Sequence, residues 1–387
     1  MSPTNIKKYG IAITLALSLT ACGGGGGGTS SSSIQNVVAS VIDDNMFQFA
    51  WHINKNINTT YKTSNNIDDE AHISLEEAWA VTKGQQTNGQ AIKVAIIDED
   101  FEVNHPNIKS KIFKVYNAMD GSSNIADSDG DTFYHGLAVA GIVAGDEVGV
   151  APQTQLILIN LDFENNTLSE ADVIEAFTYA QNNGARVINC SWGLGSIPQT
   201  VSDKITELKD AGIIVVFSSG NDGADLDQAG NEDLSEIDTV IGVGASSILN
   251  DVTSYSNYGS TIDVIAPGGG GVNNSSNLLG ILSLDQSGSA GENKNTQLSY
   301  TNENLDNYTL TSGTSFAAPT TTGLVALMLS VNPNLTFAQV RNILISTTDK
   351  VGGTNADYSV GSFDTKRAYG KINAKKAIEA AQASLNP

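Results

Sequence analysis

Residues 312–319 of this 387-residue chain read Ser-Gly-Thr-Ser-Phe-Ala-Ala-Pro, and an apolar run, Gly323–Val331, follows them. The run predicts a buried helix, and the stretch before it places Ser315 where that helix starts. Free backbone N–H groups and the positive end of the helix dipole would stabilise negative charge forming next to Ser315. An isolated serine at this position is most simply an N-cap. Partners elsewhere in the chain decide whether it is a nucleophile.

Three earlier motifs each carry a polar side chain at the end of an expected element. Lys93–Asp98 is an apolar run that predicts a buried parallel strand, with the Asp98 carboxylate at its C-terminal end. A helix of small residues is expected to begin at His135, and Val215–Asn221 predicts another buried strand that ends in the Asn221 amide. Each residue alone is more simply a turn or cap residue. Together, in this order, they indicate one site.

The chain order of these side chains is Asp98, His135, Asn221 and Ser315. That order and the flanking residues resemble the subtilisin-like serine proteases, the subtilase family. The resemblance covers roughly residues 75–383, with further matches at residues 151–152, 187–193, 266–268 and 369–374. It implies a three-layer subtilisin-like α/β fold, in which a mostly parallel central sheet carries helices on both faces.

The resemblance implies a serine endopeptidase that works through an acyl-enzyme, with Asp98, His135 and Ser315 as its triad. A hydroxyl is a weak nucleophile, so His135 would take its proton and later return it to the leaving amine. Asp98 would hold the imidazole in one tautomer and stabilise the imidazolium. Asn221 and the Ser315 N–H would hold the oxyanion, and losing one such donor typically costs about 3–4 kcal/mol. This chemistry requires no cofactor.

Six residues are expected by resemblance to flank the substrate peptide: Ser191, Trp192, Gly193, Ser218, Ser219 and Gly220. Unpaired backbone groups of Ser191 and Gly193 would bind the substrate as an added strand. Trp192 stands where the family usually has a smaller apolar residue. It either narrows a neighbouring subsite or belongs to the core.

Two departures from the family pattern flank the triad. Glu99 and Asp100 replace a small hydroxyl residue and a glycine, and Leu137 replaces a threonine after His135. Additional negative charge near Asp98 would favour protonated His135. The acid limb of the pH–rate profile is therefore expected at a higher pH than without these carboxylates.

The formal net charge is −22, from 42 acidic and 20 basic residues. This charge argues against nucleic acid as a partner and against attraction to anionic lipid head groups. Polypeptide substrates, neutral or basic near the cleft, remain the expected partners.

The first residues read as a targeting segment. Two lysines precede the apolar stretch Ile11–Leu19, which is too short to span a bilayer and is typical of a secretory signal. Leu19–Cys22 resembles the lipobox of bacterial lipoproteins, which implies lipidation of Cys22 and an outer-membrane or cell-surface location. Several acyl chains would give lasting membrane attachment. A plain signal peptide with an incidental cysteine is the simpler alternative.

The expected domains are a signal peptide (1–21), a lipidated cysteine with a Gly/Ser tether (22–33), an N-terminal extension (34–74) and the catalytic domain (75–387). The extension shows few helix or strand signals before Ile73, and Ile34–Ala50 is a candidate self-inhibiting segment. Ser74 and Glu77 have capping-box spacing for a first helix. Residues 268–310 are expected to be an insertion, mostly a long surface loop, with a short strand at Ile281–Ser283.

Asp127–Asp131 is the densest acidic run, with alternating carboxylates around a glycine. Such a run suits a hard cation such as Ca²⁺, and calcium sites are common in the family. A solvated acidic turn is the simpler interpretation. A structural calcium ion is left open, and its ligands are unknown.

Two alternatives to hydrolysis are open. One is a catalytically silent lipoprotein that keeps the subtilase fold for binding. The other is a peptide ligase or macrocyclase that releases the same acyl-enzyme with an amine.

Overall fold

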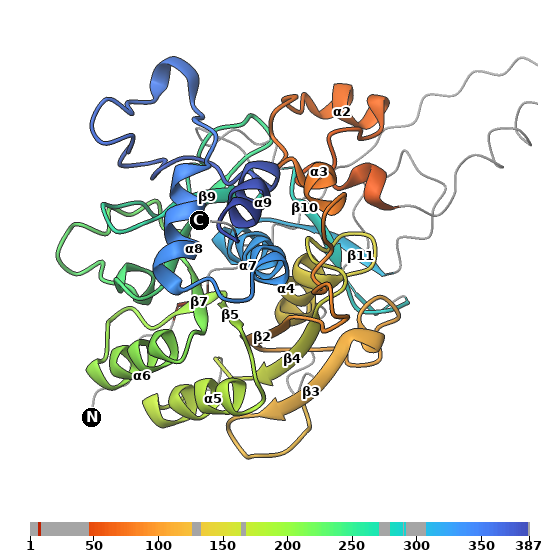
Figure 1. The fold of residues 1–387 in the computed structure, drawn as a ribbon, viewed down its shortest axis with the longest axis vertical. Helices are drawn as coiled ribbons and strands as arrows, with labels where there is room; N and C mark the ends of the chain where they lie inside the picture. Colours follow the sequence, from red (N-terminus) through yellow and green to blue (C-terminus); the bar gives the residue numbers. More distant parts are fainter. Residues whose placement is uncertain are drawn as a thin grey trace, which may run out of the picture.

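Seven parallel strands form the central sheet, in the order β3-β4-β2-β5-β7-β8-β9 (Figure 1). Their residues are almost all buried, as expected for parallel strands covered on both faces. The strands are β2 (Lys93–Asp98), β3 (Ile112–Asn117), β4 (Gln155–Asn160), β5 (Val187–Cys190), β7 (Ile214–Ser218), β8 (Ile241–Ser246) and β9 (Val264–Pro267).

Helices cover both faces of this sheet, and the alternation of side chains along β2 shows how. Val94 and Ile96 belong to the core shared with α4, α7 and α9, while Ala95 and Ile97 belong to the core shared with α5 and α6. The predicted three-layer α/β fold is therefore confirmed. The α-helices around the sheet are α4 (His135–Ala144), α5 (Glu170–Asn182), α6 (Gln199–Asp210), α7 (Thr314–Val331), α8 (Phe337–Ser346) and α9 (Ala374–Ala383).

This architecture comes from a computed structural model that describes residues 7–8, 46–125, 133–163, 168–270, 279–288, 290–291 and 307–385. Cys22, the tether, most of the expected signal peptide and the whole acidic run Asp127–Asp131 lie outside the described residues. Within the described part, α7 alone has the length and apolar composition of a membrane span, and it is almost entirely buried in the core.

The segment before residue 75 contains more structure than the sequence predicts. A 3-10 helix, η1 (Met46–Phe49), and a helix, α2 (Thr59–Asn65), precede α3 (Leu75–Trp79). The expectation of few elements before Ile73 is therefore wrong for α2. Large side chains of this segment are fully buried in the same core as α4 and α7. From residue 46 on, the expected extension thus shares its core with the rest of the molecule.

The helix expected after Ser74 forms, but its predicted cap does not. Ser74 has a φ of 56° and makes no side-chain capping hydrogen bond. Its backbone N–H donates instead to Nδ1 of His72 at 2.9 Å. A left-handed residue directs its side chain away from the helix end, so the spacing to Glu77 has no effect here. By contrast, α9 has a side-chain N-cap, because Oδ1 of Asn373 accepts from the Lys376 N–H at 3.0 Å.

The insertion between residues 268 and 310 is less of a surface loop than predicted. Strand β10 (Ile281–Leu284) lies within the insertion and pairs antiparallel with β11 (Tyr308–Thr311) at its end. The side chains of β10 are fully buried. The predicted strand at 281–283 is confirmed. Trp51 donates its indole N–H to the Gly280 carbonyl at 2.8 Å, which joins this pair to the N-terminal segment. Residues 271–278 and 292–306 lie outside the description.

Short elements complete the chain. A two-residue strand, β6 (Trp192–Gly193), pairs antiparallel with β1 (Lys7–Lys8). The remaining 3-10 helices are η2 (Lys109–Lys111), η3 (Leu234–Glu236) and η5 (Gly353–Asn355).

Candidate active site

A carboxylate and an imidazole meet where β2 ends and α4 begins. Nδ1 of His135 lies 2.6 Å from Oδ1 of Asp98. Asp98 is the last residue of β2 and is 1% exposed, while the His135 side chain is 14% exposed. The predicted positions of both residues at element ends are confirmed. A buried carboxylate at this distance holds the imidazole in one orientation and stabilises its protonated form.

The turn after Asp98 fixes the start of α4. The Glu99 carbonyl accepts from the Gly136 N–H at 2.8 Å, and the Asp100 carbonyl accepts from the Leu137 N–H at 3.1 Å. A Cβ on Gly136 would lie only 2.3 Å from the Glu99 oxygen, so this close approach requires glycine. The backbone carbonyls of Glu99 and Asp100, which replace the usual family residues, therefore hold the first turn of α4.

Ser315 lies at the N-terminal end of α7, as its second residue, and is fully buried. Its hydroxyl donates to the Ser191 carbonyl at 3.2 Å. The next side chain, Phe316, has its ring 5.4 Å from the His135 ring. The structure therefore brings the start of α7 against the start of α4, although His135 and Ser315 lie 180 positions apart in the sequence.

Asn221 presents its amide toward the same helix end. Its Oδ1 accepts from the Thr314 N–H at 2.9 Å and from the Thr314 hydroxyl at 3.0 Å. Its Nδ2 is buried and has no hydrogen-bond partner among the described residues. An unsatisfied buried amide costs roughly 1–3 kcal/mol, so a donor held this way suits a ligand oxygen. β7 itself ends at Ser218, three residues earlier than the predicted strand.

The loop from Ser218 to Asn221 is held by a residue that the sequence did not indicate. The Asn257 N–H donates to the Gly220 carbonyl at 2.9 Å, and the Ser219 hydroxyl donates to the Asn257 carbonyl at 3.0 Å. Oδ1 of Asn257 also accepts from the Asp222 N–H at 3.0 Å. No periodicity or motif marks Asn257, because its partners lie more than thirty positions away.

Ser191, Trp192 and Gly193 lie at and beside β6, but the Trp192 side chain does not face a subsite. It is 2% exposed, donates its indole N–H to the Ile97 carbonyl at 2.8 Å and packs edge-on against Phe217. Its size and polar N–H are accommodated between the sheet and α5. The structure therefore supports the core interpretation of Trp192 and not the narrowed aromatic subsite.

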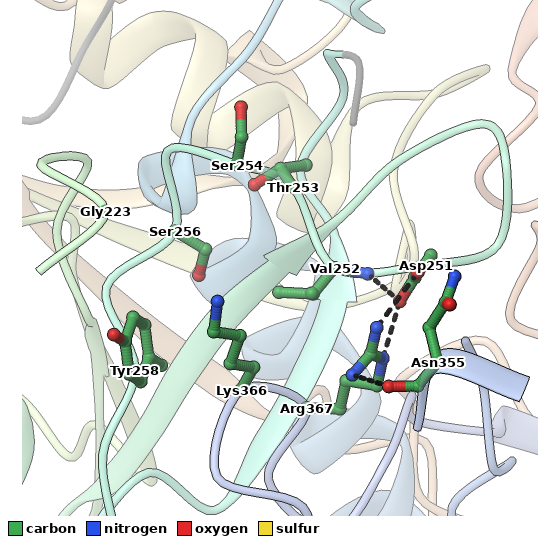
Figure 2. Close-up of a pocket in the computed structure, with 10 residues that line it drawn as sticks. All are labelled: Gly223, Asp251, Val252, Thr253, Ser254, Ser256, Tyr258, Asn355, Lys366 and Arg367. Carbon is green, nitrogen blue, oxygen red and sulfur yellow. Dashed lines mark hydrogen bonds and ion pairs between the residues drawn. The ribbon is translucent and has the colours of Figure 1, made fainter. Parts of the chain in front are cut away.

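Among the described residues, no group of three or more His, Cys, Asp or Glu side chains is arranged to hold a metal ion. A polar cavity of about 390 Å³ borders Gly223, two residues after Asn221 (Figure 2). Figure 2 shows the guanidinium of Arg367 paired with Asp251, and their closest contact is 2.6 Å. None of the predicted catalytic or substrate-binding residues lines this cavity, and we assign it no role.

A parallel α/β sheet with an Asp–His pair at one strand end, and a serine at the start of the central helix, defines the subtilisin-like class of fold. The family model described as the subtilase family matches residues 89–362 of the sequence. The chain therefore belongs to the subtilase family.

Curated relatives agree with this assignment. The chain is 29% identical over 307 residues to a thermophilic serine proteinase of a Bacillus species, covering 78% of this chain and 64% of the relative. It is 30% identical over 359 residues to a calcium-dependent protease of Trichormus variabilis, covering 86% of this chain and 51% of the relative. The chain thus spans only about half to two thirds of the length of these relatives.

Solved structures show the same fold. A protease of Pseudoalteromonas arctica superposes with a TM-score of 0.63 at 26% identity, covering 80% of this chain and 94% of that one. A structure described as a lanthipeptide protease superposes with a TM-score of 0.66 at 23% identity, covering 86% of this chain and 94% of that one. At that identity the second likeness shows the fold alone.

Proposed function

We propose that this chain is a serine endopeptidase whose triad is Asp98, His135 and Ser315, with Asn221 as an oxyanion donor. The observation that carries the proposal is the 2.6 Å contact between Asp98 and His135 beside the helix start that bears Ser315. Family membership supports it. The pseudo-enzyme alternative finds no support in these contacts, because an amide N–H₂ group left without a partner near a serine is costly unless a ligand uses it.

The proposed reaction begins with Ser315. With Nδ1–H of His135 bound to Asp98, Nε2 is the basic nitrogen and accepts the Ser315 proton as Oγ bonds to the peptide carbonyl carbon. The carbonyl oxygen becomes negative between Nδ2 of Asn221 and the Ser315 N–H. His135 then gives the proton to the leaving amine as the C–N bond breaks. Water repeats the sequence on the acyl-enzyme, and its proton returns to Ser315.

The substrate is proposed to bind as an extended strand on β6. The antiparallel pairing of Lys7–Lys8 with Trp192–Gly193 supports this proposal, because a bound peptide would use the same backbone edge. The backbones of Ser218, Ser219 and Gly220 would flank the peptide on the other side. The formal charge of −22 favours neutral or basic peptides over acidic ones.

A fluorophosphonate probe tests the triad directly. Wild type should be labelled on Ser315 and should hydrolyse peptides, and Ser315→Ala should do neither. Ser254, an exposed serine, provides the control, since Ser254→Ala should be labelled like wild type. Equal labelling of wild type and Ser315→Ala would refute the proposal. Product masses separate hydrolysis from ligation, because ligated products would contain the added amine.

We further propose that the protein is exported and attached to a membrane by a lipid on Cys22. The support is the charged start, the apolar stretch and the lipobox-like Leu19–Cys22. The Gly/Ser residues of 22–33 would let the enzyme work at a root-mean-square distance of roughly 15–20 Å from the surface. Metabolic labelling with a fatty acid should mark wild type and not Cys22→Ser. Label on both proteins would contradict the anchor.

A structural calcium ion is proposed only for stability. Its support is the acidic run Asp127–Asp131 and two relatives named calcium-dependent proteases. Chelation should lower the melting temperature without changing the initial rate of the folded enzyme. A melting temperature that ignores both chelator and added Ca²⁺ would remove this proposal.

A further inference from the structure

A buried series of hydrogen bonds runs from the body of α7 to its first turn. The Thr322 hydroxyl donates to Oδ1 of Asn189 at 2.9 Å, and Nδ2 of Asn189 donates to Oγ of Ser191 at 2.9 Å. The Ser191 hydroxyl in turn donates to the Ser315 carbonyl at 2.7 Å. All four residues are at most 1% exposed, so water does not compete for these bonds.

Pro319 explains why the Ser315 carbonyl takes a donor from outside its helix. In an α-helix this carbonyl would accept from the N–H of residue 319. That residue is proline, which lies inside α7 and has no N–H. A buried carbonyl without a donor is costly, and the Ser191 hydroxyl supplies the missing bond.

Each bond in the series sets the direction of the next one. A hydroxyl has one hydrogen, so Ser191, which already accepts from Asn189, directs that hydrogen to the Ser315 carbonyl. Asn189 can donate to Ser191 only with its amide nitrogen on that side. The Thr322 hydroxyl secures this orientation by donating to the amide oxygen.

The series ends at the two groups that must be aligned for attack. The Ser315 carbonyl accepts from the Ser191 hydroxyl, and the Ser315 hydroxyl donates to the Ser191 carbonyl at 3.2 Å. Ser191 directly precedes the β6 edge on which the substrate is proposed to bind. The nucleophile and the substrate strand are thus joined by reciprocal bonds, and a displacement of about 1 Å between such groups can cost 10²-fold in rate.

We propose that Asn189 and Thr322 are positioning residues that align Ser315 with the substrate-binding edge through Ser191. This inference rests on the proposed peptidase function. Neither residue touches the substrate, so both act on the rate of acylation and hardly on substrate affinity. A purely structural role would lower stability and leave the turnover of the folded enzyme unchanged.

The test compares two neighbouring threonines of α7 in the full chain. Thr322→Val removes the hydroxyl that orients Asn189, whereas Thr321→Val removes an equally buried hydroxyl that bonds within the helix, to the Ala317 carbonyl at 3.2 Å. Thr322→Val should lower kcat and the phosphonylation rate roughly tenfold with KM unchanged within twofold. Thr322→Ser should restore both rates, and Thr321→Val should keep them.

A double-mutant cycle then shows whether the residues act in series. Ser191→Ala should lower kcat at least as much as Thr322→Val, and the double variant should lose no more than Ser191→Ala alone. Additive losses, equal kcat in the Thr322→Val and Thr321→Val proteins, or a change confined to KM would overturn the inference. Should Thr322→Val not fold, Ser191→Ala decides alone: an unchanged kcat overturns the inference, and a roughly tenfold loss at constant KM supports it.

The two levels of the argument fail differently. A wild type that takes up no phosphonate overturns the peptidase proposal and this inference with it. A labelled wild type whose Thr322→Val variant reacts equally fast overturns the inference alone.

Discussion

His52 should make the folded state sensitive to acid. The residue lies directly after Trp51 in the N-terminal segment and is completely buried. Burial lowers its pKa from 6.5 to about 3, and a backbone hydrogen bond at Val148 opposes the shift only in part. The folded protein therefore keeps a neutral imidazole, whereas the unfolded chain binds a proton below about pH 6.5. Acidification favours the unfolded state.

The size of the effect follows from the two pKa values. The unfolded state binds more protons between about pH 6.5 and pH 3, so stability falls by about 1.4 kcal/mol for each pH unit within that window. At pH 5 the loss relative to pH 8 is about 2 kcal/mol for this one group. Asp263 acts in the opposite direction, because burial raises its pKa to about 6 and acid stabilises its folded form. Comparing the acid-induced loss of stability in wild type and in His52→Gln cancels the contribution of Asp263, which is the same in both proteins.

Urea unfolding at pH 8 and pH 5 measures this term, in the Ser315→Ala background to prevent autolysis. Replacing His52 with glutamine should remove about 2 kcal/mol of the acid-induced loss, whatever it does to stability at pH 8. His72→Gln is the comparison variant. His72 is only half-buried, and burial lowers its pKa less than that of His52, so its replacement should recover less of the acid-induced loss. If wild type and His52→Gln lose equal stability between the two pH values, the reasoning is wrong.

Three further predictions follow from the site. Asn221→Leu should lower kcat by roughly 10²–10³-fold with little change in KM, because Nδ2 of Asn221 would bind the oxyanion and not the ground-state substrate. Initial-rate measurements check this, and a defect in KM alone would contradict it. Glu99→Ser with Asp100→Gly should move the acid limb of the kcat/KM profile to lower pH, because the negative charge that favours protonated His135 is removed. Glycine is compatible with the φ of 57° at position 100. An unmoved acid limb would exclude this electrostatic effect. Gly136→Ala should destabilise the protein by roughly 1–3 kcal/mol and lower activity, since its Cβ would meet the Glu99 carbonyl at 2.3 Å; an unchanged unfolding midpoint would show that the turn yields freely.

Much of the fold was predictable because element ends carry local signals. The apolar run before Asp98 is the strand β2, and the small residues after His135 form α4. The Asn373 cap is also local, since its partner lies three residues away. These features depend on neighbours along the chain, which a sequence displays directly.

Local patterns failed where distant contacts override them. Ser74 and Glu77 have the spacing of a capping box, yet the backbone at residue 73 is held by α9, because the Ala374 N–H donates to the Ile73 carbonyl at 2.7 Å. That contact and the left-handed Ser74 leave the serine side chain off the helix end. The strand at 281–283 was predicted, but its partner β11 was hidden by the polar residues before it.

The sequence by itself determined the family, the order of the four chemical side chains and the alternation of strands and helices, since motif and periodicity are properties of the chain. Only the tertiary structure decided how those side chains are held. The bond between Thr322 and Asn189 joins positions 133 apart, and that between Ser191 and Ser315 joins positions 124 apart. Periodicity shows which face of an element is buried but not which residue it meets, so partners at such separations become visible only once the chain has folded.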